Sequence, residues 1–139
     1  MPCTGTCYCG AIILETSDQP LQMGYCHCEN CRKYSGAPLA SFALWKTDQV
    51  KITQGEELMG TFASSEMSNR LYCIECGTHL AVDHPALGFI DIRTPLEGLT
   101  FKPSVHLNYD EKFVAIRDGL PKLRDFPKEI GGSGETLPE

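Results

Sequence analysis

Residues 26–31 read Cys26-His27-Cys28-Glu29-Asn30-Cys31 and place three thiols within six residues. Thiolates set two or three residues apart on a turn can reach a single ion without strain, and zinc takes such thiolates as tetrahedral ligands. A disulfide between Cys26 and Cys28 would be strained, because only one residue separates them. The stretch therefore predicts a metal site on a tight turn, with the metal reinforcing a small hydrophobic core.

Two cysteine pairs flank this stretch, Cys7-Tyr8-Cys9-Gly10 before it and Cys73-Ile74-Glu75-Cys76-Gly77 after it. Each pair supplies half of a tetrahedral zinc site. The pairs together predict a closed site in which four thiolates join the start of the chain to its middle. Because a closed site has no open position, we expect this zinc to be structural.

The central cluster of Cys26, Cys28 and Cys31 supplies three ligands, and an open fourth position is what a catalytic or substrate-binding zinc requires. The site is instead closed if another side chain provides the fourth ligand. The candidates for that ligand are His27, His79, His84 and an outside cysteine. Spacing alone leaves both readings open.

The cysteines also allow other interpretations. They could be buried or surface thiols without metal. A thioredoxin-like redox pair is another interpretation, but it leaves the extra thiol of the central cluster without a role. Redox sensing by loosely bound thiols is a further alternative, and it predicts metal release on mild oxidation. Cys3 stands apart from the clusters, as a free thiol or as a further ligand.

The composition and net charge of the chain argue against some classes of function. Twelve Lys and Arg against eighteen Asp and Glu give a formal charge of -6, which disfavours binding to nucleic acid phosphates. The longest apolar runs are too short to span a bilayer, and no signal-peptide pattern occurs at the start. We therefore expect a cytoplasmic protein with no nucleic acid or membrane partner, in a reducing compartment where thiols are available to metal.

Short apolar or alternating segments broken by Gly, Pro, Asn and Asp predict a mostly β fold with at most short helical turns. We expect a single small zinc-stabilised domain of several short antiparallel strands over residues 1–130, followed by a flexible tail over 131–139. The predicted strands are Ala11 to Glu15, Leu39 to Trp45, Val50 to Thr53, Asn69 to Tyr72, His79 to Val82, Phe89 to Arg93, Val105 to Leu107 and Phe113 to Ile116. One helical turn is expected over Glu29 to Tyr34.

The ordered combination of motifs resembles the glutathione-dependent formaldehyde-activating enzyme family, to which the centromere protein V group is related. The supporting segments are Gly5-Thr6-Cys7-Tyr8-Cys9-Gly10, Cys26-His27-Cys28-Glu29-Asn30-Cys31-Arg32, Cys73-Ile74-Glu75-Cys76-Gly77-Thr78 and Pro103-Ser104-Val105-His106. The resemblance covers most of the chain. It implies a β-rich fold with two zinc ions, one held by the outer cysteine pairs and one by the central three.

The resemblance also implies an activity. In the family the central metal binds the thiol of glutathione, which reacts with formaldehyde to give S-hydroxymethylglutathione, and the reverse reaction is that of a carbon-sulfur lyase. Zinc would lower the pKa of the bound thiol, and the resulting thiolate would attack the aldehyde carbon. No protein nucleophile is needed, so no catalytic residue is assigned beyond the metal site.

Basic residues beside the cysteines are candidates for contacts with glutathione carboxylates, since guanidinium forks match that geometry. They are Arg32, Lys33 and Arg70, of which Arg32 is assigned as cofactor-binding. The alternative is that these charges only offset the thiolates. For the whole protein, the alternative function is a non-catalytic zinc-stabilised binding module, which would lack the exchangeable fourth ligand that the enzyme needs.

Overall fold

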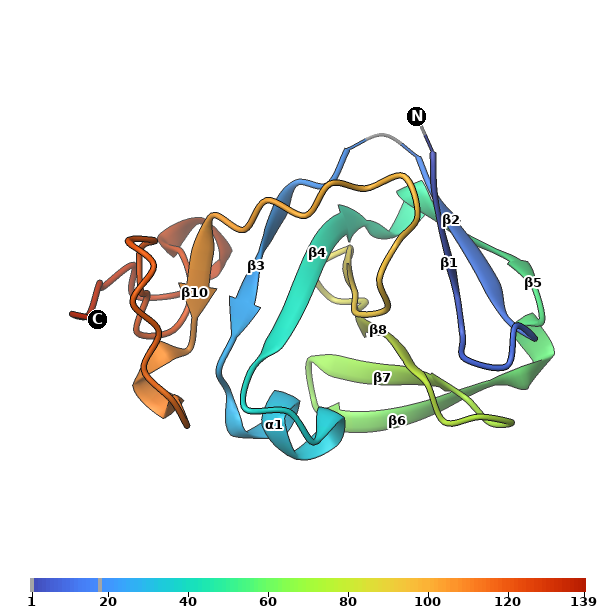
Figure 1. Cartoon of the computed structure of the whole chain (residues 1–139), viewed down its shortest axis with the longest axis horizontal. Coiled ribbons are helices and arrows are strands. Elements are labelled where there is room, and N and C mark those ends of the chain that lie inside the picture. The colour runs from blue at the N-terminus through green and yellow to red at the C-terminus, as the bar shows by residue number, and fades with distance from the viewer. Residues whose placement is uncertain (1, 18) are drawn as a thin grey trace. The chain divides into compact units, whose positions relative to one another are not determined.

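The computed structural model describes residues 2–17 and 19–139 of the chain (Figure 1). Ten strands and one α-helix occur in this described part, so the prediction of a mostly β fold is confirmed. The chain forms two compact units, each assembled from two separate stretches. Unit 1 comprises Met1–Leu21 and Ala43–Phe101, and unit 2 comprises Gln22–Phe42 and Lys102–Glu139.

Unit 1 contains a three-stranded antiparallel sheet (Figure 1). In it, β2 (Ile13–Thr16) lies between β1 (Cys3–Thr6) and β5 (Val50–Gln54). Leu14 and Thr16 of β2 are buried while Glu15 between them is exposed. This alternation, with a period of two residues, gives the sheet one covered face and one open face.

The same unit contains a run of antiparallel strands in the order β4-β9-β8-β7-β6, of which β4 belongs to this unit from Ala43 onward. Their bounds are β4 Ala40–Lys46, β6 Met59–Ser65, β7 Ser68–Cys73, β8 His79–His84 and β9 Phe89–Ile92. Three successive residues of β8, Leu80 to Val82, are buried, as expected for a central strand covered on both faces. The 3-10 turns Thr47–Gln49 and Glu56–Leu58 precede β5 and β6.

Unit 2 is built around the parallel pair of β3 (Gln22–Cys26) and β10 (Val105–Leu107). A Cβ at Gly24 would lie 2.3 Å from the carbonyl oxygen of Val105, so this close approach requires glycine. The helix α1 (Glu29–Ser35) follows β3 after two residues and confirms the predicted helical turn. It has seven residues, and the described residues include no helix with the length and apolar character to cross a membrane.

After β10 the chain runs through two 3-10 turns, Tyr109–Glu111 and Lys128–Ile130. The last residues form backbone hydrogen bonds with this region, from Arg124 N to Glu135 O at 2.8 Å and from Leu137 N to Lys122 O at 2.7 Å. Flexibility of residues 131–139 in solution, and the extent of the zinc domain over 1–130, stay predictions.

The predicted strand at Phe113 to Ile116 is wrong. These residues lie in bends and irregular backbone, and the Phe113 side chain is 66% exposed. Aromatic and β-branched residues favour a strand only where a partner strand and a buried face are available. Three strands were not predicted, namely β1, β3 and β6.

Candidate metal centres

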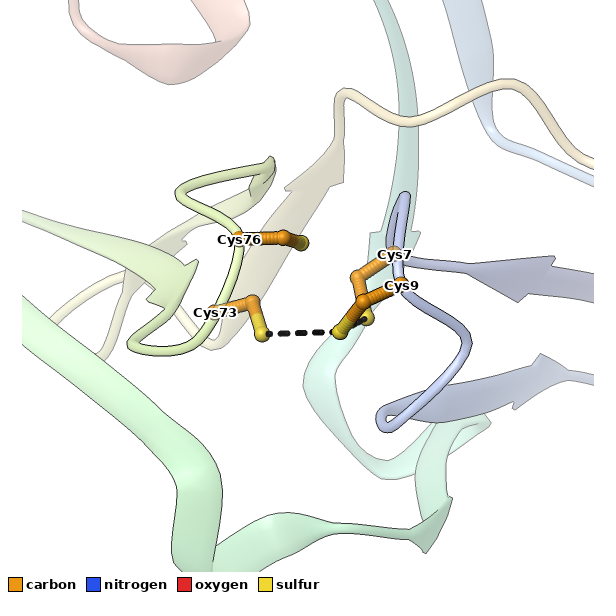
Figure 2. Close-up of side chains that lie close together, drawn as sticks. All are labelled: Cys7, Cys9, Cys73 and Cys76. Atoms are coloured by element: carbon orange, nitrogen blue, oxygen red, sulfur yellow. Dashed lines mark hydrogen bonds between the residues drawn. The ribbon is translucent and has the colours of Figure 1, made fainter.

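Four cysteine sulfurs of unit 1 converge, two from the loop after β1, one from the end of β7 and one from the turn between β7 and β8 (Figure 2). The Sγ atoms of Cys7 and Cys9 lie 3.6 Å apart, and those of Cys9 and Cys73 lie 3.9 Å apart. With Cys76, all four lie within 4.8 Å of one another. Sulfurs placed tetrahedrally about 2.3 Å from zinc are separated by about 3.8 Å. The four free thiols therefore fit a zinc site closed by sulfur.

Each cysteine pair sits on a turn that ends in a glycine. Gly10 N donates to Cys7 O at 3.0 Å, and Gly77 N donates to Cys73 O at 2.8 Å, so the second turn is one residue longer. The two glycines have φ values of 77° and 81°, in the left-handed region that residues with a Cβ rarely adopt. The Cys-x-Cys-Gly and Cys-x-x-Cys-Gly patterns thus both use a left-handed glycine to close the turn that carries the sulfurs.

Polar hydrogens around these sulfurs favour thiolates. Ile12 N donates to Cys7 Sγ at 3.3 Å, and the Thr78 hydroxyl lies 3.2 Å from Cys76 Sγ. The bond from Thr78 lowers the pKa of Cys76 to about 5. The Ala11 N–H lowers the pKa of Cys9, but partial desolvation and the neighbouring thiols outweigh it and raise that pKa to about 12. The Cys76 thiol thus ionises readily, whereas the Cys9 thiol resists ionisation because its charge would be repelled by neighbouring thiolates. A divalent cation would relieve the repulsion between these thiolates.

Three further sulfurs, those of Cys26, Cys28 and Cys31, form a second cluster in unit 2, within 4.8 Å of one another. Cys26 ends β3, Cys28 is the N-cap of α1, and Cys31 lies in the first turn of the helix. Because positions three residues apart share one face of a helix, the helix start brings Cys28 and Cys31 together. Cys26 and Cys31 are buried and Cys28 is half-buried.

Two donors orient sulfurs of this cluster. Asn108 Nδ2 donates to Cys26 Sγ at 3.3 Å, and Cys31 N donates to Cys28 Sγ at 3.3 Å. Hydrogen bonds with Cys28 and Cys31, together with burial, raise the pKa of Cys26 well above its usual value. The hydrogen bond with Cys26 lowers the pKa of Cys28, but Cys31 and burial outweigh it, so the pKa of Cys28 is raised as well. Deprotonation of all three therefore calls for a cation, so this donor set also fits zinc.

His27 lies between two of these cysteines but is directed elsewhere. Its Nε2 is 2.8 Å from His106 Nδ1, and its ring packs edge-on against Tyr109 with centroids 4.9 Å apart. Burial, and then the charge of His106, lower the pKa of His27 to about 4. Within residues 2–17 and 19–139, the cluster contains three potential ligands and no histidine.

Comparison with known proteins agrees with this arrangement. The family model of the glutathione-dependent formaldehyde-activating enzyme matches residues 2–111, which include both cysteine clusters. The chain belongs to this family.

One relative is an uncharacterized lyase of Schizosaccharomyces pombe (strain 972), 34% identical over 76 residues that make up 55% of this chain and 53% of the relative. The chain thus spans about half the length of this curated relative. A crystal structure of a Rhodobacter sphaeroides protein superposes with a TM-score of 0.58, over 72% of this chain and 91% of that chain, at 20% identity. At that identity the likeness shows the fold alone.

The predicted basic residues of this family member have different environments. Arg32 lies on α1, where its Nε donates to His27 O at 3.0 Å and its Nη2 to Glu111 O at 2.9 Å. Arg32 and Lys33 also line a pocket of about 280 Å³ together with Phe113. Arg70 belongs to unit 1, is buried, and donates to Ser64 Oγ at 3.3 Å. Of the two predicted arginines, Arg32 is thus the one that lies in the same unit as the three-cysteine cluster.

A polar network beside the three-cysteine cluster, buried at His27, His106 and Lys122, was not predicted. It connects His27 through His106 to Asp118, Lys122 and Glu139. His106 is part of the Pro-Ser-Val-His motif, but nothing in its spacing singled it out. Asp118, Lys122 and Glu139 are charged residues in a segment beyond the family match. No local sequence pattern indicates that they contact one another.

Proposed function

We propose that the protein is a zinc-dependent carbon-sulfur lyase of the formaldehyde-activating type. It would form or cleave S-hydroxymethylglutathione, or a related adduct of a thiol and an aldehyde, at the three-cysteine cluster. The observation that carries this proposal is the cluster itself. Cys26, Cys28 and Cys31 bring three sulfurs together, one of them half-exposed, and no fourth potential ligand joins them in the described part of the chain.

The two cysteine clusters would have different roles, one structural and one in substrate binding. Cys7, Cys9, Cys73 and Cys76 can satisfy a tetrahedral zinc completely, so that site would hold unit 1 together. The three-cysteine cluster leaves one tetrahedral position for a substrate. A zinc ion held there would lower the pKa of a thiol that binds at that position, which supplies a thiolate nucleophile.

The adduct forms without a covalent bond to the protein. The thiol sulfur bonds to the aldehyde carbon, the carbonyl π electrons move to oxygen, and the proton lost by the thiol ends on that oxygen. In the reverse direction the carbon-sulfur bond breaks and the two substrates are released. In this scheme Asn108 and the N-terminus of α1 hold the sulfurs of Cys26 and Cys28 in place.

Arg32 is proposed to contact a carboxylate of glutathione. A guanidinium has five N–H donors, and two of them already bond to backbone carbonyls, which fixes the plane of the group. The remaining donors of this half-buried side chain can form a forked pair with a carboxylate. Cytoplasmic location, where thiols and glutathione stay reduced, belongs to the same proposal.

The test is zinc content per chain together with zinc-edge X-ray absorption, before and after addition of glutathione. We expect two zinc ions per chain and an average of about 3.5 sulfur neighbours per zinc, rising to about 4 when the thiol binds. S-methylglutathione, which has no free thiol, is the control ligand and should leave the average unchanged.

The Cys28→Ser variant provides the matched protein control, because it removes one ligand of the central cluster and leaves the four-cysteine cluster intact. It should lose the response to glutathione. Two zinc ions with four fixed ligands each, unchanged by glutathione, would instead favour a non-catalytic zinc-stabilised module.

A further inference from the structure

A continuous chain of hydrogen bonds leads from the three-cysteine loop to the last residue of the described chain. His27 Nε2 and His106 Nδ1 are 2.8 Å apart, and His106 Nε2 lies 2.7 Å from Asp118 Oδ2. Lys122 Nζ bonds to Asp118 Oδ1 and to Glu139 Oε2. All five residues belong to unit 2.

The charged end of this hydrogen-bond chain joins a buried cation to two partly exposed carboxylates. The Lys122 side chain is 1% exposed, and its ammonium group has three acceptors, Asp118, Glu139 and the carbonyl of Leu120. Glu139 Oε2 also accepts the N–H groups of Asp118 and Gly119. The buried ammonium thus has all three of its donors satisfied, and it fixes the position of the Asp118 carboxylate.

The acceptors in the chain determine where the imidazole protons lie. An ionised Asp118 only accepts, so the proton of His106 is on Nε2. With one proton on each ring, His106 Nδ1 is then an acceptor, and His27 must donate from its own Nε2. His27 Nδ1 is left as a buried acceptor with no partner among the described residues. Tyr109 and Tyr25 pack against the two rings and hold their planes.

The network combines two parts of the sequence. His27 and His106 lie within the residues matched by the family model, whereas Asp118, Lys122 and Glu139 lie beyond residue 111, where that match ends. The segment after the family match thus supplies the groups that orient two rings inside it.

We propose that Asp118, held by Lys122 and Glu139, is a positioning residue that acts through His106 to fix the tautomer and orientation of His27. Fixing His27 would in turn hold the loop that carries Cys26 and Cys28 in the geometry that binds metal. This second step rests on the proposed function, because it treats the three-cysteine cluster as a metal site. The first step concerns hydrogen bonds alone.

The Asp118→Asn variant tests the first step without metal. Because Lys122 requires an oxygen at the Oδ1 position, the amide nitrogen of the new side chain must face His106 and donate to it. His106 would then carry its proton on Nδ1, and His27 would carry its own on Nδ1 as well. We expect 15N NMR of the imidazole nitrogens to show Nε2–H tautomers of both rings in the wild type and Nδ1–H tautomers in the variant.

Cobalt titration of the same proteins tests the second step, with Cys28→Ser as a reference that binds cobalt only at the four-cysteine cluster. Asp118→Asn should weaken Co²⁺ binding at the three-cysteine cluster about tenfold and leave the four-cysteine cluster unchanged. The control is Glu135→Gln, on the same terminal segment, which removes one of the two carboxylates paired with Arg124, at an exposed ion pair. It should change neither the tautomers nor the affinity.

A wild-type His27 protonated on Nδ1 would overturn the proposal, even if the variant did not fold. Unchanged tautomers in Asp118→Asn, or equal loss of cobalt affinity at both clusters, would overturn it as well. If the wild-type chain bound only one cobalt ion while the tautomers inverted as expected, the proposed function would fail and the positioning of His27 would stand.

Discussion

Thr78 connects the two halves of the four-cysteine cluster through one hydroxyl group. Its Oγ1 accepts the N–H of Tyr8, in the first cysteine pair, at 2.8 Å and lies 3.2 Å from the sulfur of Cys76, in the second. Because the oxygen accepts from Tyr8, its proton is available to the sulfur. Groups of this kind, one bond removed from a metal, orient the ligands and tune their basicity.

Replacing Thr78 by valine keeps the shape of the side chain and removes both bonds. We expect zinc affinity at the four-cysteine cluster to fall about tenfold, whereas Thr78→Ser, which keeps the hydroxyl, should stay close to the wild type. Competition with a chromophoric chelator measures both affinities. Equal losses in the two variants would contradict a specific role of the hydroxyl group.

For single residues, the sequence indicated which cysteines lie in the same cluster but not which residues surround them. Spacing grouped the seven cysteines as the structure does, because ligands on one turn are close in sequence. Their roles as zinc ligands stay predictions. Asn108 bonds to Cys26 across 82 residues of sequence, and Asp118 reaches the central loop only through His106. Such partners are brought together by the fold and have no local sequence pattern.

The turn between β7 and β8 depends on one glycine. Gly77 has a φ of 81°, and a Cβ at this position would meet no atom within 4 Å, so backbone strain is the whole cost of a side chain there. We expect Gly77→Ala to destabilise the zinc-loaded protein by about 1–2 kcal/mol. Gly77→Asn should cost less, because asparagine tolerates this conformation. Urea unfolding measures both, and an alanine variant as stable as the wild type would contradict the assignment.

His84 joins the end of β8 to two neighbouring segments of unit 1. Its Nε2 is 2.8 Å from Asp91 Oδ2 on β9, and its Nδ1 is 3.1 Å from Ser68 Oγ on β7. Burial alone would lower the pKa of His84, but the hydrogen bond and charge of Asp91 outweigh it, so the pKa is raised. Protonated His84 can donate from both nitrogens to these acceptors.

A raised folded-state pKa gives stability a pH dependence of known sign. The contribution of His84 is fully present below its unfolded pKa of about 6.5 and is lost as the pH rises through the higher folded value. We expect the thermal midpoint of the wild type, relative to that of Asp91→Asn, to fall as the pH rises from about 6 to about 8.5. A constant difference between the two proteins across this range would refute the assignment.

The strands show why some elements could be predicted and others not. β9 alternates buried isoleucines with half-buried residues, and β8 contains the apolar run Leu80 to Val82, so both have a pattern that can be recognised in the sequence. β6 is a largely exposed edge strand of small and polar residues, and its strand character comes from pairing with β7. The segment Phe113 to Ile116 has strand-forming residues without such a partner. Both errors, the missed strand β6 and the wrongly predicted strand, therefore depend on whether the fold provides a partner strand, which the local sequence does not show.

The antiparallel arrangement expected from the sequence holds in unit 1, while unit 2 contains the parallel pair of β3 and β10. These strands are separated by most of the chain, and no short-range signal indicates their direction. The close approach of Gly24 to Val105, which the structure reveals, explains why a residue without a side chain occupies this position of β3.

The two clusters should respond differently to the loss of one sulfur. In a closed structural site the energy of metal binding is part of the energy of folding, so Cys76→Ala should lower the thermal midpoint by about 10 °C or more. Cys28→Ala should chiefly remove one zinc ion and change the midpoint much less. Thermal melts paired with zinc analysis measure this, and equal losses in both variants would contradict the division of roles.

The discontinuous construction of unit 1 has a consequence for how the protein is made. Cys9 leaves the ribosome 64 residues before Cys73, its partner in the cluster, which at 5–20 residues per second is a wait of about 3–13 seconds. The sulfurs of the central cluster emerge within six residues of one another, in well under two seconds at these rates. The nascent chain thus offers a complete three-sulfur cluster while the amino-terminal pair still lacks its partners, so the timing of biosynthesis favours loading the central cluster first.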